Sequence, residues 1–75
     1  MEKREGVMIY DIEDDLYDIR FDIDEYYGGL HCGQCFDVLL KKTWMPTRIE
    51  KSRDWYLIDI DPKIKMQGLI VRIKD

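Results

Sequence analysis

The sequence has few of the residues from which metal centres and nucleophilic active sites are built. Its 75 residues include one histidine, His31, two cysteines, Cys32 and Cys35, and three serine or threonine hydroxyls. Structural zinc takes four ligands at tetrahedral geometry, usually Cys and His, so this chain would have to recruit a carboxylate or a second subunit. No nucleophile–base signature accompanies the hydroxyls. We therefore expect a protein without catalytic activity, resident metal or cofactor.

Long apolar runs are also absent. No stretch approaches the roughly 20 apolar residues that a membrane-spanning helix needs. The charged amino terminus is not followed by an apolar stretch of signal-peptide length. Linkers, low-complexity tracts and internal repeats are missing as well. These absences predict a single domain over residues 1–75 in the cytoplasm, with no membrane partner and with both thiols reduced.

Apolar and charged residues are both abundant, but the charge is unevenly spread. The hydrophobic fraction is 45%, nine residues are aromatic, and the net charge is −4, which is the composition of a folded domain with a charged surface. The segment from Asp11 to Glu25 has eight acids and one base, whereas that from Lys41 to Arg53 has five bases and one acid. Two interpretations stay open: two solvated faces, or a bipolar molecule whose basic segment meets an acidic partner.

The segment from Ile9 to Tyr26 fits two periodicities. Its apolar residues recur at spacings of three and four, as in a helix, but Tyr17, Ile19 and Phe21 also alternate with charged residues, as in a strand. Ile, Tyr and Phe favour strands over helices. We therefore predict strands here, with a hairpin turn in the Asp-rich break that precedes Leu16.

Four later segments also have the pattern of short strands. They are FDVLL (36–40), WMPTRIE (44–50), DWYLIDI (54–60) and GLIVRIK (68–74). Pro46 marks an edge strand or a bulge, because proline cannot donate a hydrogen bond to a ladder. Short strands joined by short turns predict an all-β fold, a small antiparallel SH3-like barrel of five to six strands.

The strings YYGGLHCG, WMPTRIE, DWYLIDI and GLIVRI, in this order, resemble a bacterial family of small proteins with a domain of unknown function. The resemblance covers nearly the whole chain. It implies an SH3-like all-β fold, no assigned catalytic activity, and an association with phage and with conjugative or integrative elements. Cys35 is not part of the family pattern.

The stretch GGLHCGQCF (28–36) contains both cysteines at the C-x-x-C spacing of dithiol oxidoreductases. Those enzymes need a long helix after the motif, whereas here Pro46 follows within about three helical turns. We therefore interpret the stretch as a tight passage between strands, with Leu30 and Cys32 inward and with His31 outward or bonded to a nearby carbonyl. A metal or thiol site at Cys32 and Cys35 remains a distant alternative.

The most suggestive binding surface is basic and aromatic. Its candidate residues are Lys41, Lys42, Trp44, Arg48, Lys51, Arg53 and Trp55. In the competing interpretation, which we favour, Trp55 and Leu57 belong to the core, and Arg48 pairs with Glu50 or covers an indole ring by a cation–π contact. We predict a non-catalytic interaction module that binds a protein, as an accessory protein of a mobile element. The alternative is a barrel that binds nucleic acid through this basic and aromatic patch. The sequence leaves the oligomeric state open.

Overall fold

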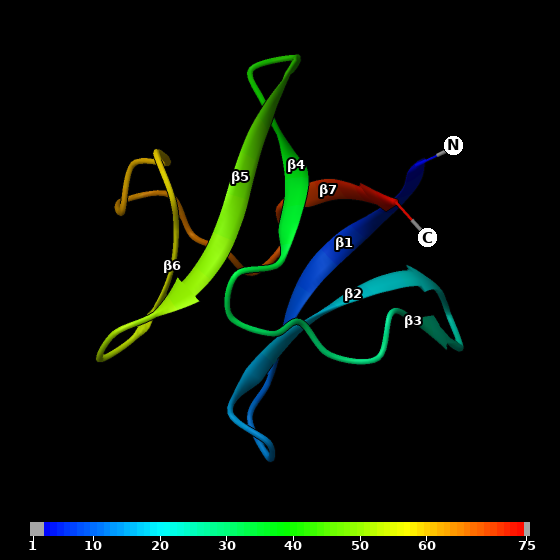
Figure 1. The fold of residues 1–75 in the computed structure, drawn as a ribbon. Helices are drawn as coiled ribbons and strands as arrows, with labels where there is room; N and C mark the ends of the chain where they lie inside the picture. Colours follow the sequence, from blue (N-terminus) through cyan, green and yellow to red (C-terminus); the bar gives the residue numbers. More distant parts are fainter. Residues whose placement is uncertain (1–2, 75) are drawn as a thin grey trace.

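A single antiparallel sheet forms the molecule (Figure 1). The computed structural model describes residues 3–74, and every regular element within them is a β-strand. The strands are β1 (Lys3–Asp11), β2 (Leu16–Asp22), β3 (Glu25–Tyr26), β4 (Cys35–Leu40), β5 (Thr43–Lys51), β6 (Trp55–Leu57) and β7 (Ile70–Lys74). Their order in the open sheet is β3-β2-β1-β7-β4-β5-β6. The predicted small, antiparallel, all-β fold is confirmed, with seven strands rather than five to six.

The first hairpin resolves the ambiguous segment in favour of strands. Tyr10 pairs with Tyr17 and Met8 with Ile19 across β1 and β2. The turn between them is built by aspartates, as predicted: the Asp11 carboxylate accepts hydrogen bonds from two turn amides, and Asp15 adopts a left-handed φ of 50°. Asp tolerates this conformation better than most residues, which explains the composition of the turn.

The hairpin between β4 and β5 has a two-residue turn of unusual composition. Leu40 pairs with Thr43, and the intervening Lys41 and Lys42 have φ of 49° and 67°. Two consecutive positive φ values define the turn that matches the twist of a β-hairpin, and Asn-Gly is its usual sequence. Two lysines here therefore carry backbone strain.

β5 changes partners along its length. It pairs with β4 through Arg48 and with β6 from Ile49 onward, so within residues 3–74 its first half borders an open edge. Pro46 lies in this half and has no N–H to offer there, which weakens the edge as a template for another strand. Pro46, predicted to mark an edge strand or a bulge, thus lies where β5 has no partner strand on one side among the described residues, although β6, and not β5, is the edge strand of the sheet.

The predicted strand at residues 54–60 is shorter in the structure. β6 ends at Leu57, and the chain then turns, with Ile60 N–H donating a hydrogen bond to the Leu57 carbonyl at 3.4 Å. The chain then forms a long irregular loop that returns to β1, where Gly68 N–H donates to the Met8 carbonyl at 2.8 Å. Figure 1 shows this loop standing beside β6, at the edge of the sheet.

The sheet curls so that one face encloses a core. The buried apolar residues are Met8, Ile19, Leu30, Phe36, Val38, Ile49, Leu57, Val71 and Ile73. Gly6 allows the curl: a Cβ at this position would lie 2.5 Å from Ile19 Cγ2 and 2.7 Å from the Arg20 carbonyl oxygen. The strands can therefore approach closely only with glycine there.

The GGLHCG stretch crosses the open side of this core. Asp18 Oδ1 accepts hydrogen bonds from the amides of Gly28 (3.0 Å) and Gly29 (2.8 Å), and both glycines have positive φ. Leu30 N–H donates to the Tyr17 carbonyl at 2.8 Å, and the Leu30 side chain is buried. The inward position predicted for Leu30 is confirmed.

The end of the same stretch attaches to β5. Gly33 N–H donates to the Ile49 carbonyl at 2.7 Å, and Ile49 N–H donates to the Gln34 carbonyl at 3.1 Å. The tight turn at Gly33 leaves Cys32 exposed. The prediction that Cys32 points inward is wrong, because the chain reverses at that residue instead of continuing as an alternating strand.

Candidate interaction surface

The two tryptophans of the predicted patch lie on opposite faces of the sheet. Trp44 is on the outer face of β5, since Thr47 and Ile49, an odd number of residues away, are buried on the core face. Trp55 is on the inner side of β6, where its partly buried ring packs against the core. The predicted single basic and aromatic patch is therefore divided into two separate regions.

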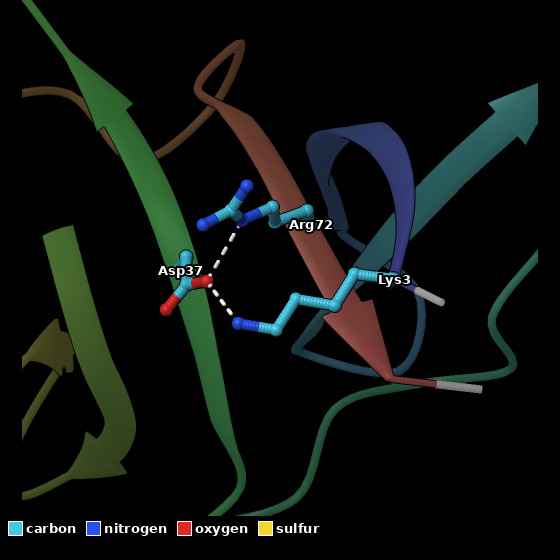
Figure 2. Close-up of polar contacts among 3 residues, drawn as sticks. All are labelled: Lys3, Asp37 and Arg72. Carbon is cyan, nitrogen blue, oxygen red and sulfur yellow. Dashed lines mark hydrogen bonds and ion pairs between the residues drawn. The ribbon is translucent and has the colours of Figure 1, made fainter. Parts of the chain in front are cut away.

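Trp44 is covered by a charged side chain of this chain itself. The Arg72 guanidinium lies 4.4 Å from the centroid of its ring, a cation–π contact. Figure 2 shows that Arg72 also reaches Asp37, which in addition binds Lys3. Asp37 Oδ2 is 2.6 Å from Lys3 Nζ and 2.8 Å from Arg72 Nε.

Asp37 is a buried carboxylate, 8% exposed, and its two cationic partners explain why it stays charged. The hydrogen bond from Lys3 above all, together with that from Arg72, lowers the pKa of Asp37 against the opposing effect of burial. Lys3, Asp37 and Arg72 come from β1, β4 and β7. This cluster ties the centre of the sheet together, which is a structural role.

The basic candidates also separate along β5. Lys41 and Lys42 form the turn at its start, whereas Lys51 and Arg53 lie at its far end, up to roughly 30 Å of strand away. Arg48, between them, forms a 2.8 Å ion pair with Glu50 on the same strand face. The predicted Arg48–Glu50 pairing is confirmed.

The structure does bring three of the predicted residues together at the far end. Lys51, Arg53 and Trp55 line a cavity of about 340 Å³, here named the aromatic pocket, whose other lining residues are Tyr10, Asp15, Tyr17 and Asp54. The Tyr10 and Tyr17 rings are 5.1 Å apart and tilted by 51°. The Tyr17 and Trp55 rings are 6.5 Å apart and nearly perpendicular, at 81°.

Asp15 organises the polar side of the aromatic pocket. Its carboxylate binds Lys51 Nζ at 2.8 Å and the Tyr10 hydroxyl at 2.5 Å, and its carbonyl accepts from Trp55 Nε1 at 3.1 Å. The Lys51 hydrogen bond, followed by that of Tyr10, lowers the pKa of Asp15. Conversely, the hydrogen bond to Asp15 raises the pKa of Tyr10, and burial raises that of Tyr17.

A second cavity also has Trp55 in its lining. It has a volume of about 290 Å³ and is here named the β6 groove. Its lining residues are Trp55, Tyr56, Leu57, Ile60, Asp61, Pro62, Ile64 and Met66. Most of them are apolar, and Tyr56 is 42% exposed. The groove therefore offers apolar surface with a single charged residue, Asp61.

The main chain of β6 adds polar groups to this groove. Ile58 N–H donates to the Arg48 carbonyl at 3.0 Å, so these two residues form a hydrogen-bonded pair of the antiparallel ladder. Hydrogen-bonded and non-hydrogen-bonded pairs alternate along such a ladder, so the main-chain groups of Tyr56 face β5 and those of Trp55 and Leu57 face away from it. β6 is the last strand of the sheet, so these groups point toward its edge, where the Leu57 carbonyl already accepts from Ile60 N–H.

The cysteines and the histidine do not converge on a site. His31, Cys32 and Cys35 are all exposed, and both thiols are free. Within residues 3–74, no three potential ligands among His, Cys, Asp and Glu lie close enough together to hold a metal ion. Likewise, no helix among these residues could span a bilayer. The outward position predicted for His31 is confirmed.

Sequence reasoning missed most of the residues around Trp55. Tyr10, Tyr17 and Ile60 were assigned only to strands, and Ile64 and Met66 received no role. A usable signal was present in the segment IDIDPKIKM (58–66), where apolar residues alternate with charged ones although Pro62 interrupts any strand. Apolar residues in an irregular segment pack against a neighbouring surface, and here Ile60, Ile64 and Met66 line the groove beside β6.

Comparisons with known proteins agree with this architecture. The model of a family described as "Domain of unknown function (DUF5348)" matches residues 6–73. A protein from Ruminococcus gnavus, whose crystal structure was determined by a structural-genomics consortium, is 53% identical in sequence. The match covers 93% of this chain and 100% of the other, with a TM-score of 0.88. No curated protein matches the sequence.

Proposed function

The chain belongs to the DUF5348 family of domains of unknown function, and we propose that it is a non-catalytic interaction module. Its ligand is an extended, basic segment of a partner protein, and its binding site is the β6 groove. The observation that carries the proposal is an apolar groove lined by β6 and the loop that follows it, with the exposed Tyr56 in the lining. In the recognition of extended peptides, pockets of this kind accept side chains and supply the specificity.

The size and lining of the groove suit a peptide side chain. A volume of about 290 Å³ is at the lower end of ligand pockets. Tyr56 and Trp55 are residue types that dominate binding energy at interfaces, because they present large, rigid surfaces. Ile64 and Met66 form the opposite wall. The groove can therefore hold one or two apolar side chains of the partner.

The charges around the groove favour a basic segment. Asp61 is the charged residue of the lining, and Asp15 and Asp54 line the adjoining aromatic pocket. The turn that contains Asp15 also carries Asp11, Glu13 and Asp14. Four bases also lie here, Lys51 and Arg53 in the aromatic pocket and Lys63 and Lys65 in the loop beside the groove, and the Lys51 ammonium is bound to Asp15. The six acids named above outnumber these four bases. Complementary charge steers association and selects among partners.

The nucleic-acid alternative has less support from this arrangement. Its candidate residues are divided between the two ends of β5, and the Trp44 ring is covered by Arg72. The acidic turn at Asp15 also lies next to Lys51, where it repels phosphates. We retain this alternative as an outcome of the experiment below.

The proposal includes the cellular setting that the resemblance implies, a cytoplasmic accessory protein of a mobile genetic element. A survey of the genes that adjoin family members tests this part. Recurrent neighbours for integration, conjugation or phage assembly support it, whereas neighbourhoods of housekeeping genes alone contradict it.

A selection from a random-peptide library with the immobilised protein tests the binding site. We expect enrichment of peptides in which apolar residues adjoin Lys or Arg. Tyr56→Ala should weaken their binding by roughly tenfold, because it removes an exposed aromatic contact from the groove. The matched control is Tyr26→Ala, since Tyr26 is 48% exposed on β3, the opposite edge strand, and this variant should bind normally.

Two results would overturn the proposal. One is that no peptide is enriched. The other is that Tyr56→Ala and Tyr26→Ala bind the enriched peptides equally well. If no peptide is enriched and a single-stranded oligonucleotide binds at low salt, with affinity that falls steeply as salt rises and that requires Lys41 and Lys42, the nucleic-acid alternative replaces it.

A further inference from the structure

Three aromatic rings line the aromatic pocket, those of Tyr10, Tyr17 and Trp55. They are inclined to one another, at 51° between Tyr10 and Tyr17 and at 81° between Tyr17 and Trp55, and do not form a parallel stack. Aromatic faces carry partial negative charge and attract cations. The rest of the lining has two carboxylates, Asp15 and Asp54, and two basic side chains, Lys51 and Arg53.

The pocket already attracts a cation from its own chain. Lys51 Nζ lies 5.2 Å from the centroid of the Trp55 ring and 2.8 Å from Asp15 Oδ2. An ammonium group is thus held jointly by an aromatic face and a carboxylate. The Lys51 side chain is about one-third exposed, so this intramolecular ammonium lies where a competing cation from solvent can reach it.

We propose that the aromatic pocket binds an organic cation, the ammonium or methylated ammonium side chain of a partner protein, and that Lys51 competes for the site. The biological ligand in this inference rests on the proposed function, because the pocket shares Trp55 with the β6 groove. The chemistry of the pocket does not depend on it. An incoming quaternary ammonium contacts the rings without needing hydrogen-bond acceptors, whereas Lys51 depends on Asp15 for its position.

Titration with tetramethylammonium chloride, followed by tryptophan fluorescence, tests the pocket directly. The Trp44→Phe background leaves Trp55 as the reporter, since the chain has two tryptophans. We expect a saturable change with tetramethylammonium and none with sodium chloride at equal ionic strength. Lys51→Met should tighten binding by roughly two- to fivefold, because it removes the competing ammonium.

Two further variants provide the controls. Lys51→Arg keeps a competing cation and should bind no tighter than the parent. Asp15→Asn removes the carboxylate and should weaken binding in the Lys51→Met background. The inference is overturned if tetramethylammonium acts like sodium in every variant, or if Lys51→Met binds no tighter than Lys51→Arg. A positive titration together with a failed peptide selection would contradict the proposed function but leave the cation site standing.

Discussion

At the scale of single residues, Asp37 is the charge on which the centre of the sheet depends. It is 8% exposed and is held by Lys3 and Arg72, which lower its pKa. A lowered pKa means that the folded state holds the proton less tightly than the unfolded state. The resulting stabilisation is complete above the ordinary Asp pKa of about 4 and is lost as the pH falls through the lowered value.

We therefore predict that Asp37→Asn lowers the free energy of unfolding at neutral pH by about 1–2 kcal/mol. The value is modest because both cations are one-third exposed, so that water and salt screen part of the attraction. Urea denaturation over a pH series measures it. The difference from the parent should shrink as the pH falls below about 4. A difference that stays constant down to the acid transition would contradict this account.

The turn residue Lys42 carries strain that glycine would relieve. Its φ is 67°, in the left-handed region, which costs a residue with a Cβ about 1 kcal/mol. Lys42→Gly should therefore raise the free energy of unfolding by up to about 1 kcal/mol. Lys42→Ala is the matched control, because it removes the same charge but keeps the Cβ. Equal stabilities for the two variants would show that charge, and not the backbone, decides the effect.

At the scale of elements, Gly6 determines how closely β1 approaches β2. An added Cβ would collide with a backbone carbonyl, that of Arg20, as well as with the Ile19 side chain. We predict that Gly6→Ala lowers the free energy of unfolding by about 1–3 kcal/mol, the usual cost of overpacking. Chemical denaturation beside the exposed neighbour Glu5→Ala measures it. If both variants are equally stable, the close approach is not a constraint.

The strands were predictable from the sequence because period-two alternation is a local property. The alternation from Tyr17 to Ile23 and the Asp-rich turn before Leu16 identified the first hairpin, and Pro46 identified an open edge. The end of β6 was harder to predict from the sequence. Its apolar alternation continues to Ile60, but β6 ends at Leu57 and the residues that follow line the groove. Their path depends on bonds to residues distant in sequence, such as that from the Thr47 hydroxyl to the Ile58 carbonyl.

Cys32 shows the limit of the same reasoning. Alternation predicted it to point inward with Leu30, but the passage from Gly28 to Gln34 is not a strand. Three glycines with positive φ and the bonds to Asp18 and Ile49 set its path. Sequence identified the glycines but not the reversal between them.

At the scale of the whole molecule, the candidate site depends on which ends of the strands meet. Lys51, Arg53 and Trp55 were predicted as binding residues, and the curl of the sheet places them against Tyr10, Asp15 and Tyr17 of the first hairpin. No local sequence pattern predicts this contact, since the first hairpin and residues 51–55 are separated by about half the chain. The predicted patch treated residues near in sequence as one surface, but alternation places Trp44 and Trp55 on opposite faces.

The central claim is that partners bind beside Trp55 and not across Trp44. The two indole N–H signals in a nuclear magnetic resonance spectrum test it most directly, each assigned with its Trp→Phe variant. During titration with a peptide from the selection, we predict that the Trp55 signal shifts saturably while the Trp44 signal stays in place. A saturable shift of the Trp44 signal alone would contradict the account and would place the binding surface on the opposite face of the sheet.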